Sequence, residues 1–259
     1  MATVLCDRRY FAPIDAVFFD KDGTLANVAD YLTSLGQRQA DCMETALPGT
    51  KAGVLKALGF DNSSLSPQGL LAVGSRSETI EGIASAAAVE GYSYQTALAA
   101  AAAATAAADR EISPKEAFTP LIPGAAELLA RLKDARLKLA LTSADSQENL
   151  QRFITYYSLS SYFDHIQGTG ADRPSKTEMG FLKTARQALR VAPEQSMVIG
   201  DARSDYVMAR NDRAAACVLV LGGWPVPQKI YSLPSDKADQ ALAPAVCTVE
   251  KLSQITAIS

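Results

Sequence analysis

The sequence predicts an α/β fold: a doubly wound parallel sheet with an all-helical cap domain inserted into it. Three observations support this prediction. The apolar run from Ala16 to Phe19 is typical of a strand buried on both faces. From residue 113 onward, helical and strand patterns alternate, as they do in a parallel sheet covered by helices on both sides. Between residues 28 and 112, the apolar spacing is helical and no strand pattern is found.

The insert is expected to be a small helical bundle. Apolar residues at helical spacing predict helices around residues 32–46, 51–58 and 80–83, and the alanine-rich run 97–108 predicts a last one. Ser75 and Glu78 have the Ser-x-x-Glu spacing of a capping box, which indicates a helix start. A serine-rich polar loop is expected over residues 61–67. The insert therefore begins at residue 28 and ends at residue 112.

The remaining segments, residues 1–27 and 113–259, form the predicted α/β core. Ser113 and Glu116 again have capping-box spacing, with Pro114 at the first helical position. Further helices are expected around residues 125–132, 150–157 and 181–189, alternating with strands at 137–141, 165–167, 197–199 and 217–221. After Leu221 we expect only a loop and a short terminal strand and helix, without recognisable chemistry.

Composition excludes several classes of function. With 259 residues and 48% hydrophobic content, the chain can bury a sizeable core. The net charge of -3 and the pI near 5.3 argue against nucleic acid or an anionic membrane as partner, whereas a small anionic metabolite needs only a local positive site. The first residues lack the apolar segment of a signal peptide, so we expect a cytoplasmic protein, either a monomer or a homodimer.

The single histidine, His165, narrows the chemistry further. It lies at the expected start of a strand, which favours a structural role over Ser-His-Asp or Cys-His catalysis. The cysteines are far apart and contain no Cys-x-x-Cys pair. Any metal ion must therefore be held by oxygen ligands, and this favours Mg²⁺.

Polar side chains follow the predicted strands at the points where the strands end. They are Asp20 and Asp22 after the first strand, Thr142 and Ser143 after the second, and Asp201 and Asp205 after the fourth, with Lys176 in a cationic loop that precedes the fourth. Because the carboxyl ends of neighbouring parallel strands converge on one crevice, we expect these side chains to share a site.

Residues Asp20 to Leu25 match the Asp-x-Asp-Gly-Thr-Leu signature of the haloacid dehalogenase (HAD) superfamily of phosphohydrolases. The other polar groups follow in the order of that superfamily's motifs, so the chain resembles it over nearly the whole core. The position and helical content of the insert resemble the C1-type cap of phosphoglycolate phosphatase and β-phosphoglucomutase relatives. The resemblance implies phosphoryl transfer from a monoester.

The resemblance also implies roles for the two leading acids and the phosphate-binding residues. Asp20 is expected to be the nucleophile that becomes an aspartyl phosphate. Asp22 is expected to protonate the leaving alkoxide and then to deprotonate the attacking water. Thr142, with Ser143 beside it, is expected to bind the phosphoryl oxygens, and Lys176 to neutralise them. Positive charge is needed because carboxylates facing a phosphate dianion repel it.

The expected ligands of Mg²⁺ are Asp20, the backbone carbonyl of Asp22, and Asp201, with Asp205 acting directly or through water. Simpler interpretations stay open at this stage. Asp201 and Asp205 would also suit an acidic helix N-terminus. Thr142 and Ser143 would also suit the cap of a helix beginning near Asp145.

The third motif departs from the family pattern, in which many relatives have Lys-Pro. This chain has Arg173 and Pro174, followed by Ser175 and Lys176. We favour Lys176 as the cation, since a compact ammonium suits a position beside a carboxylate and a phosphate. Arg173 is the alternative, and a solvated surface position for Lys176 is the simpler interpretation.

The expected function is a Mg²⁺-dependent phosphatase of a small phosphomonoester, either phosphoglycolate-like or a sugar phosphate. A phosphomutase of the β-phosphoglucomutase type would use the same core residues. A non-enzymatic phospho-acceptor module is the second alternative, but it would have neither the inserted cap nor an acid at Asp22. Substrate choice is assigned to the cap, with Arg76 as the candidate contact and a solvent-exposed arginine as the simpler interpretation.

Overall fold

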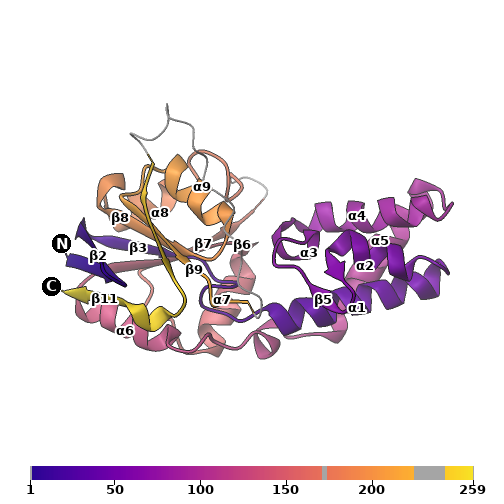
Figure 1. The fold of residues 1–259 in the computed structure, drawn as a ribbon, viewed down its shortest axis with the longest axis horizontal. Helices are drawn as coiled ribbons and strands as arrows, with labels where there is room; N and C mark the ends of the chain where they lie inside the picture. Colours follow the sequence, from indigo (N-terminus) through magenta and orange to yellow (C-terminus); the bar gives the residue numbers. More distant parts are fainter. Residues whose placement is uncertain (1, 171–173, 225–242, 259) are drawn as a thin grey trace. The chain divides into compact units, whose positions relative to one another are not determined.

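The computed structural model describes residues 2–170, 174–224 and 243–258, and its chain divides into two units (Figure 1). The first unit comprises Met1–Asn27 and Leu121–Ser259, and the second comprises Val28–Pro120. The second unit thus extends beyond residue 112 and includes the short 3-10 helix η1 (Lys115–Phe118).

The first unit is built on a six-stranded sheet whose paired strands are all parallel. In spatial order the strands are β10 (Ala245–Val249), β9 (Ala216–Val220), β8 (Ser196–Gly200), β3 (Ala16–Phe19), β6 (Lys138–Ser146) and β7 (His165–Thr169). From β3 the chain builds β6 and β7 on one side and then returns to build β8, β9 and β10 on the other. The strand order therefore reverses at β3, which is where ligands bind in sheets of this kind.

Helices cover both faces of this sheet, as the sequence predicts. In Figure 1, α6 (Ala125–Asp134) and α7 (Gln147–Tyr156) lie on one side, and α8 (Lys183–Leu189) and α9 (Arg203–Asn211) lie on the other. Phe18 of β3 is fully buried in an apolar cluster with residues of α8 and α9. With helices on both sides, all four residues of β3 are buried, which explains its unbroken apolar run.

A second sheet joins the two ends of the chain and was not predicted. It is antiparallel, with the order β11 (Ile255–Ile258), β1 (Ala2–Cys6) and β2 (Arg9–Ile14). The expected terminal helix is only a short 3-10 turn, η4 (Leu252–Gln254). Pairing between residues about 250 positions apart has no local sequence pattern, which is why this sheet was missed.

The second unit is mainly helical, with α1 (Ala29–Ala46), α2 (Lys51–Leu58), α3 (Leu70–Val73), α4 (Arg76–Val89) and α5 (Tyr94–Glu111). The capping box at α4 is confirmed: the Ser75 hydroxyl accepts from the Glu78 N–H, and the Glu78 carboxylate accepts from the Ser75 N–H. The alanine-rich run forms α5, in which Ala97, Ala101 and Ala108 are fully buried. Small side chains at these positions allow close helix packing.

Two local predictions about this unit were wrong. A short hairpin of β4 (Phe60–Asp61) and β5 (Ser64–Leu65) lies within the expected polar loop, because Asn62 adopts a left-handed conformation (φ 54°) that permits a tight turn. The capping box expected at Ser113 does not form, since Pro114 precedes only the 3-10 helix η1 and no side chain caps it. Pro120 lies too close for a longer helix to follow.

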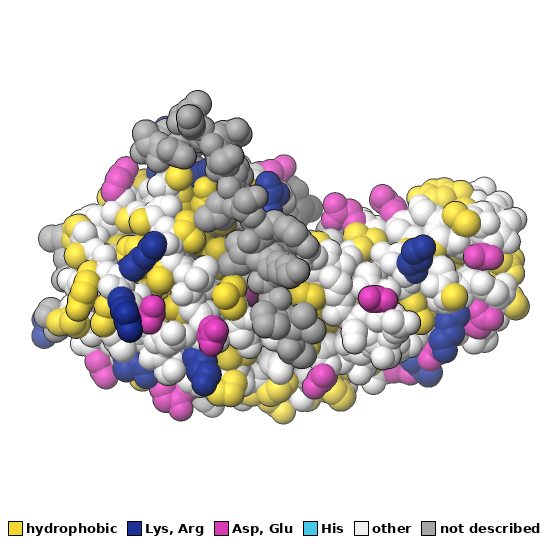
Figure 2. Space-filling model, in the orientation of Figure 1, with side chains coloured by type: hydrophobic (Ala, Val, Ile, Leu, Met, Phe, Trp, Pro, Cys, Tyr) yellow, Lys and Arg dark blue, Asp and Glu magenta, His cyan; other side chains and the backbone are white. Residues whose placement is uncertain are grey.

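The charged surface agrees with the acidic composition. On the face drawn in Figure 2, the described Lys and Arg side chains are scattered among Asp and Glu and form no continuous basic patch. Among the described helices, none combines the length and the apolar character needed to cross a membrane.

Candidate active site

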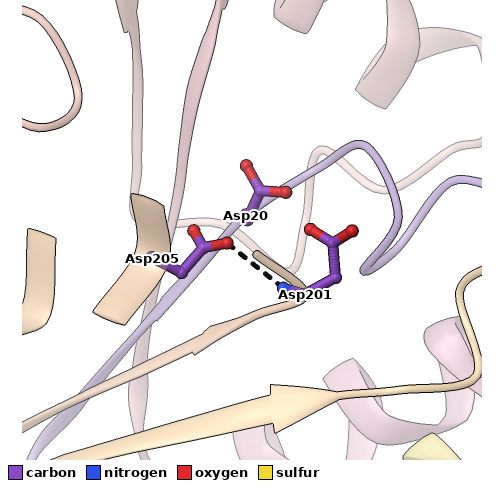
Figure 3. Close-up of side chains that lie close together, drawn as sticks. All are labelled: Asp20, Asp201 and Asp205. Carbon is purple, nitrogen blue, oxygen red and sulfur yellow. Dashed lines mark hydrogen bonds between the residues drawn. The ribbon is translucent and has the colours of Figure 1, made fainter. Parts of the chain in front are cut away.

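Three carboxylates meet where the central strands of the sheet end. Asp20 follows β3, Asp201 follows β8, and Asp205 lies in the first turn of α9 (Figure 3). One oxygen from each lies within 4.8 Å of the others, and all three side chains are buried. The sequence prediction that these acids share a site therefore agrees with the geometry.

Lys176 supplies the positive charge beside them. Its Nζ lies 2.5 Å from Asp20 Oδ1 and 2.7 Å from Asp205 Oδ1, and its side chain is only 9% exposed. The interpretation of Lys176 as a solvated surface residue is therefore wrong. Arg173, the alternative cation, lies outside the described residues.

Asp205 links this ion pair to the backbone of the site. Its Oδ2 accepts hydrogen bonds from the N–H groups of Asp201, at 3.2 Å, and of Ala202, at 3.0 Å, while Oδ1 faces Lys176. Asp205 thus serves the helix N-terminus and at the same time orients Lys176 and the loop that carries Asp201. The helix N-terminal interpretation of Asp205 therefore agrees with the structure, and its role toward a metal ion stays a prediction.

Burial shapes the electrostatics of the cluster. Burial, together with repulsion from Asp205 and Asp22, raises the pKa of Asp20 to about 7, although Lys176 opposes the shift. Burial and the nearby Asp20 and Asp205 raise the pKa of Asp201 well above its usual range. Burial disfavours the Lys176 ammonium, but Asp20 and Asp205 outweigh it and raise the pKa of Lys176 above its ordinary value.

The donor set of the cluster fits a small divalent cation. When all three carboxylates are ionised, the one ammonium leaves two negative charges uncompensated, and a divalent cation would offset them. Mg²⁺ prefers oxygen ligands, takes few carboxylates and keeps several waters. Asp20 and Asp201 suit it as direct ligands, because both oxygens of Asp205 are engaged with Lys176 and backbone N–H groups.

The Asp22 side chain is held by a residue that the sequence analysis missed. The Nζ of Lys21 donates to Asp22 Oδ1 at 2.6 Å and lies 3.1 Å from Asp145 Oδ2. The Lys21 side chain is 2% exposed and also lies over the ring of Phe153. A lysine between two acids at the end of a buried strand is a signal that could have identified this contact.

Thr142 and Ser143 differ in what their hydroxyl groups do. Thr142 is fully buried and donates to the carbonyl oxygen of Phe19 at 3.3 Å. Ser143 Oγ accepts from the N–H of Asp145 at 3.1 Å, so its own hydrogen can be donated elsewhere. The cap of α7 is Ser146, which excludes the interpretation of either residue as that helix's N-cap. The geometry thus favours Ser143 over Thr142 as the hydroxyl donor to a ligand.

Two further contacts fix Asp201. Gly23 has a φ of +83°, and a Cβ there would lie 2.1 Å from Asp201 Oδ2, so only glycine allows this approach. Trp224 Nε1 donates to the same Oδ2 at 3.0 Å. No chemistry was expected of the segment containing Trp224, although a single tryptophan after two glycines was a visible signal.

Arg76, the candidate substrate residue, lies at the start of α4 in the helical unit. Its guanidinium forms an ion pair with Asp109 of α5 and is more than half exposed. This contact accounts for its position without a ligand, and its role toward substrate stays a prediction.

Comparison with known proteins identifies the family. The model of the haloacid dehalogenase-like hydrolases matches residues 14–211. Phosphoglycolate phosphatase from Synechococcus elongatus is 31% identical over 102 residues, which cover 39% of this chain and 47% of that protein. Tyrosine-protein kinase PtkA from Mycobacterium tuberculosis is 25% identical over 140 residues, covering 53% of this chain and 45% of that protein. The matches thus span about half the length of these curated relatives.

A solved structure shows the same fold over nearly the entire chain. The HAD hydrolase, family IA, variant 3 from Entamoeba histolytica has a TM-score of 0.64 and 17% sequence identity, covering 94% of this chain and 96% of that one. At this identity the likeness concerns the fold. Together with the family match over most of the sequence, it confirms the predicted resemblance: the chain belongs to the haloacid dehalogenase-like hydrolases.

Proposed function

We propose that the chain is a Mg²⁺-dependent phosphatase that hydrolyses a small phosphomonoester through an aspartyl phosphate on Asp20. The observation that carries this proposal is the contact of Asp20 with Lys176 inside a buried carboxylate cluster at the end of β3. A nucleophilic carboxylate, a fixed cation and an oxygen-ligand site for a divalent ion are what phosphoryl transfer requires.

In the first step, a carboxylate oxygen of Asp20 forms a bond to phosphorus while the bond between phosphorus and the ester oxygen breaks. Asp22 gives its proton to the departing alkoxide, so that an alcohol leaves. In the second step, Asp22 takes a proton from water as the water oxygen attacks phosphorus. The bond between Asp20 and phosphorus then breaks, which releases phosphate and restores both acids.

The remaining residues stabilise charge on the phosphoryl group. Lys176 neutralises its oxygens, and the Ser143 hydroxyl donates to one of them. Bound Mg²⁺ would offset the repulsion between the phosphate dianion and the carboxylates. The pKa of Asp20 is raised to about 7, and Mg²⁺ held by Asp20 and Asp201 would favour the ionised form of this nucleophile.

The substrate class follows from the relatives by analogy. Phosphoglycolate phosphatase acts on a small phosphomonoester, and we infer a phosphoglycolate-like or sugar phosphate substrate here.

A phosphomutase would return the phosphoryl group to a sugar instead of to water. A cytoplasmic location and a monomeric or homodimeric state remain predictions.

The test is release of inorganic phosphate from a panel of small phosphomonoesters, including phosphoglycolate, a hexose phosphate and an aryl phosphate, with Mg²⁺ or with chelator. Asp20→Asn should abolish release, whereas Asp61→Asn, at an exposed acid of the β4–β5 hairpin, should not change it. Labelling of Asp20 by a phosphodonor without release would favour the phosphomutase or acceptor alternatives. If the protein neither releases phosphate nor becomes labelled, the assignment of Asp20 as the nucleophile is refuted.

A further inference from the structure

Trp224 lies beyond β9, outside the motifs that identify the family's catalytic residues in this sequence. Trp224 is buried, with 9% of the residue exposed, and its Nε1 donates to Asp201 Oδ2 at 3.0 Å. A buried indole N–H requires a hydrogen-bond partner, but a neutral carbonyl would satisfy it equally well. Here the partner is a carboxylate that already lies close to two others.

The backbone next to Trp224 closely approaches the turn at Gly23. A Cβ on Gly223 would lie 1.8 Å from the carbonyl oxygen of Gly23, so only glycine at position 223 lets the segment approach the turn after Asp22. Gly23 in turn approaches Asp201 Oδ2 closely. The Gly23 turn and the indole of Trp224 therefore both lie close to Oδ2 of Asp201.

We propose that Trp224 is a positioning residue for the metal site: its indole N–H fixes the Asp201 carboxylate through Oδ2 and leaves Oδ1 directed toward the cation. This inference rests on the proposed function, because it needs a divalent cation held by Asp20 and Asp201. Hydrogen bonds to the outer side of ligating carboxylates tune metal affinity, and their removal typically lowers it about 10- to 100-fold.

The hydrogen bond from Trp224 Nε1 orients the Asp201 carboxylate, since it engages Oδ2 directly. A purely structural tryptophan would contribute packing alone. The two roles can be separated, because phenylalanine keeps an aromatic ring in the buried position and lacks the N–H.

The experiment measures Mg²⁺ binding directly, with MgCl₂ alone as the probe. By calorimetry, Trp224→Phe should bind Mg²⁺ about 10- to 100-fold more weakly than the wild type. Because Trp224 is the single tryptophan, wild-type indole fluorescence should also change as MgCl₂ is added, with the same midpoint. Asp201→Asn, which keeps the indole, should abolish this response. Affinity of Trp224→Phe within about twofold of the wild type overturns the proposal.

A second pair of variants protects the test against a folding defect in Trp224→Phe. Gly223→Ala keeps the indole but displaces its segment from Gly23, so it should also weaken Mg²⁺ binding. Gly170→Ala is the matched control, since a Cβ there meets no atom within 4 Å, and it should bind Mg²⁺ like the wild type. Equal binding by the Gly223 and Gly170 variants would count against the proposal.

Failure of this inference and failure of the proposed function give different results. If the wild type binds Mg²⁺ and hydrolyses phosphomonoesters while Trp224→Phe binds the ion equally well, only the role of Trp224 is wrong. If the wild type binds no Mg²⁺ by calorimetry, both are wrong.

Discussion

The two units of the chain both contain pairs of oppositely charged side chains, but the pair at the candidate active site is buried and the pair between α4 and α5 is exposed. In the α/β unit, Asp20 and Lys176 are buried and lie in contact with other charges. In the helical unit, Arg76 pairs with Asp109 across α4 and α5, and both side chains are about one-third or more exposed to solvent. Exposed pairs of this kind contribute little to stability, since water solvates each partner well without the other.

This difference in burial separates charges on the surface from charges that are buried at the candidate active site. Removing carboxylates from water costs more than their attraction to one ammonium returns, and the raised pKa of Asp20 records that cost. Among its described residues, the helical unit buries a single charged side chain, Glu116, and its helices contain buried alanines such as Ala84 and Ala101. Charge that is expensive to bury is therefore concentrated at the candidate active site.

The strongest test of this contrast is removal of the buried ammonium. Lys176→Met should lower kcat/KM for a phosphomonoester about 10²- to 10³-fold, because the phosphoryl oxygens lose a fixed positive charge. Lys51→Met is the matched control, since that lysine pairs with Asp41 in an exposed position. Steady-state kinetics of the two variants give the comparison, and equal, small effects would contradict it.

A second test concerns Lys21, which holds the proposed acid Asp22. Lys21→Met should lower kcat about 10- to 100-fold for alkyl phosphates, because Asp22 is no longer oriented toward the leaving oxygen. Aryl phosphates with good leaving groups need little protonation and should be affected much less. Equal losses for both kinds of ester would indicate a general structural defect. Lys133→Met, which disrupts the pair with Asp164, serves as the control.

The third test exploits the raised pKa of Asp20 in the metal-free protein. The native state retains the Asp20 proton up to about pH 7, whereas the unfolded state loses it near its ordinary value, so stability falls as pH rises between the two. Asp20→Asn removes this penalty. In chelator, the stability of the variant relative to the wild type should therefore be greater at about pH 8 than at about pH 5, by roughly 3 kcal/mol.

Thermal unfolding at both pH values measures this difference, which corresponds to roughly 6–12 °C in Tm for a chain of this size. A stability gain that is the same at both pH values would show that the Asp20 charge is not its source.

The smallest effect is expected in the helical unit. Arg76→Gln and Asp109→Asn should each change the free energy of unfolding by less than about 1 kcal/mol, because their pair is exposed. The same variants test the sequence prediction for Arg76. A raised KM in Arg76→Gln but not in Asp109→Asn would assign Arg76 to substrate binding, and unchanged KM in both would reject that role.

Many features of this protein could be predicted from local sequence patterns alone. The buried run Ala16 to Phe19 and the Asp-Gly turn after it specify a central strand ending in acids, because strand periodicity and turn preferences act over a few residues. The same local patterns predicted the helical insert, the alternation of the core and the strand that ends just before Asp201, whereas β6 continues past its predicted end at Leu141 to Ser146. The resemblance to the family was also visible in the sequence, since the first motif, Asp20 to Leu25, is contiguous and the other motif residues follow in the family's order.

Only the tertiary structure decided how these residues meet. The contact between Lys176 and Asp20 joins positions 156 apart, and the terminal sheet pairs the first strand with the last. Lys21 is buried beside Asp145, and Trp224 contacts Asp201. Both contacts join segments that are not adjacent in the sequence. Periodicity reports which face of an element is buried, but the partner buried against it is selected by packing across the whole chain.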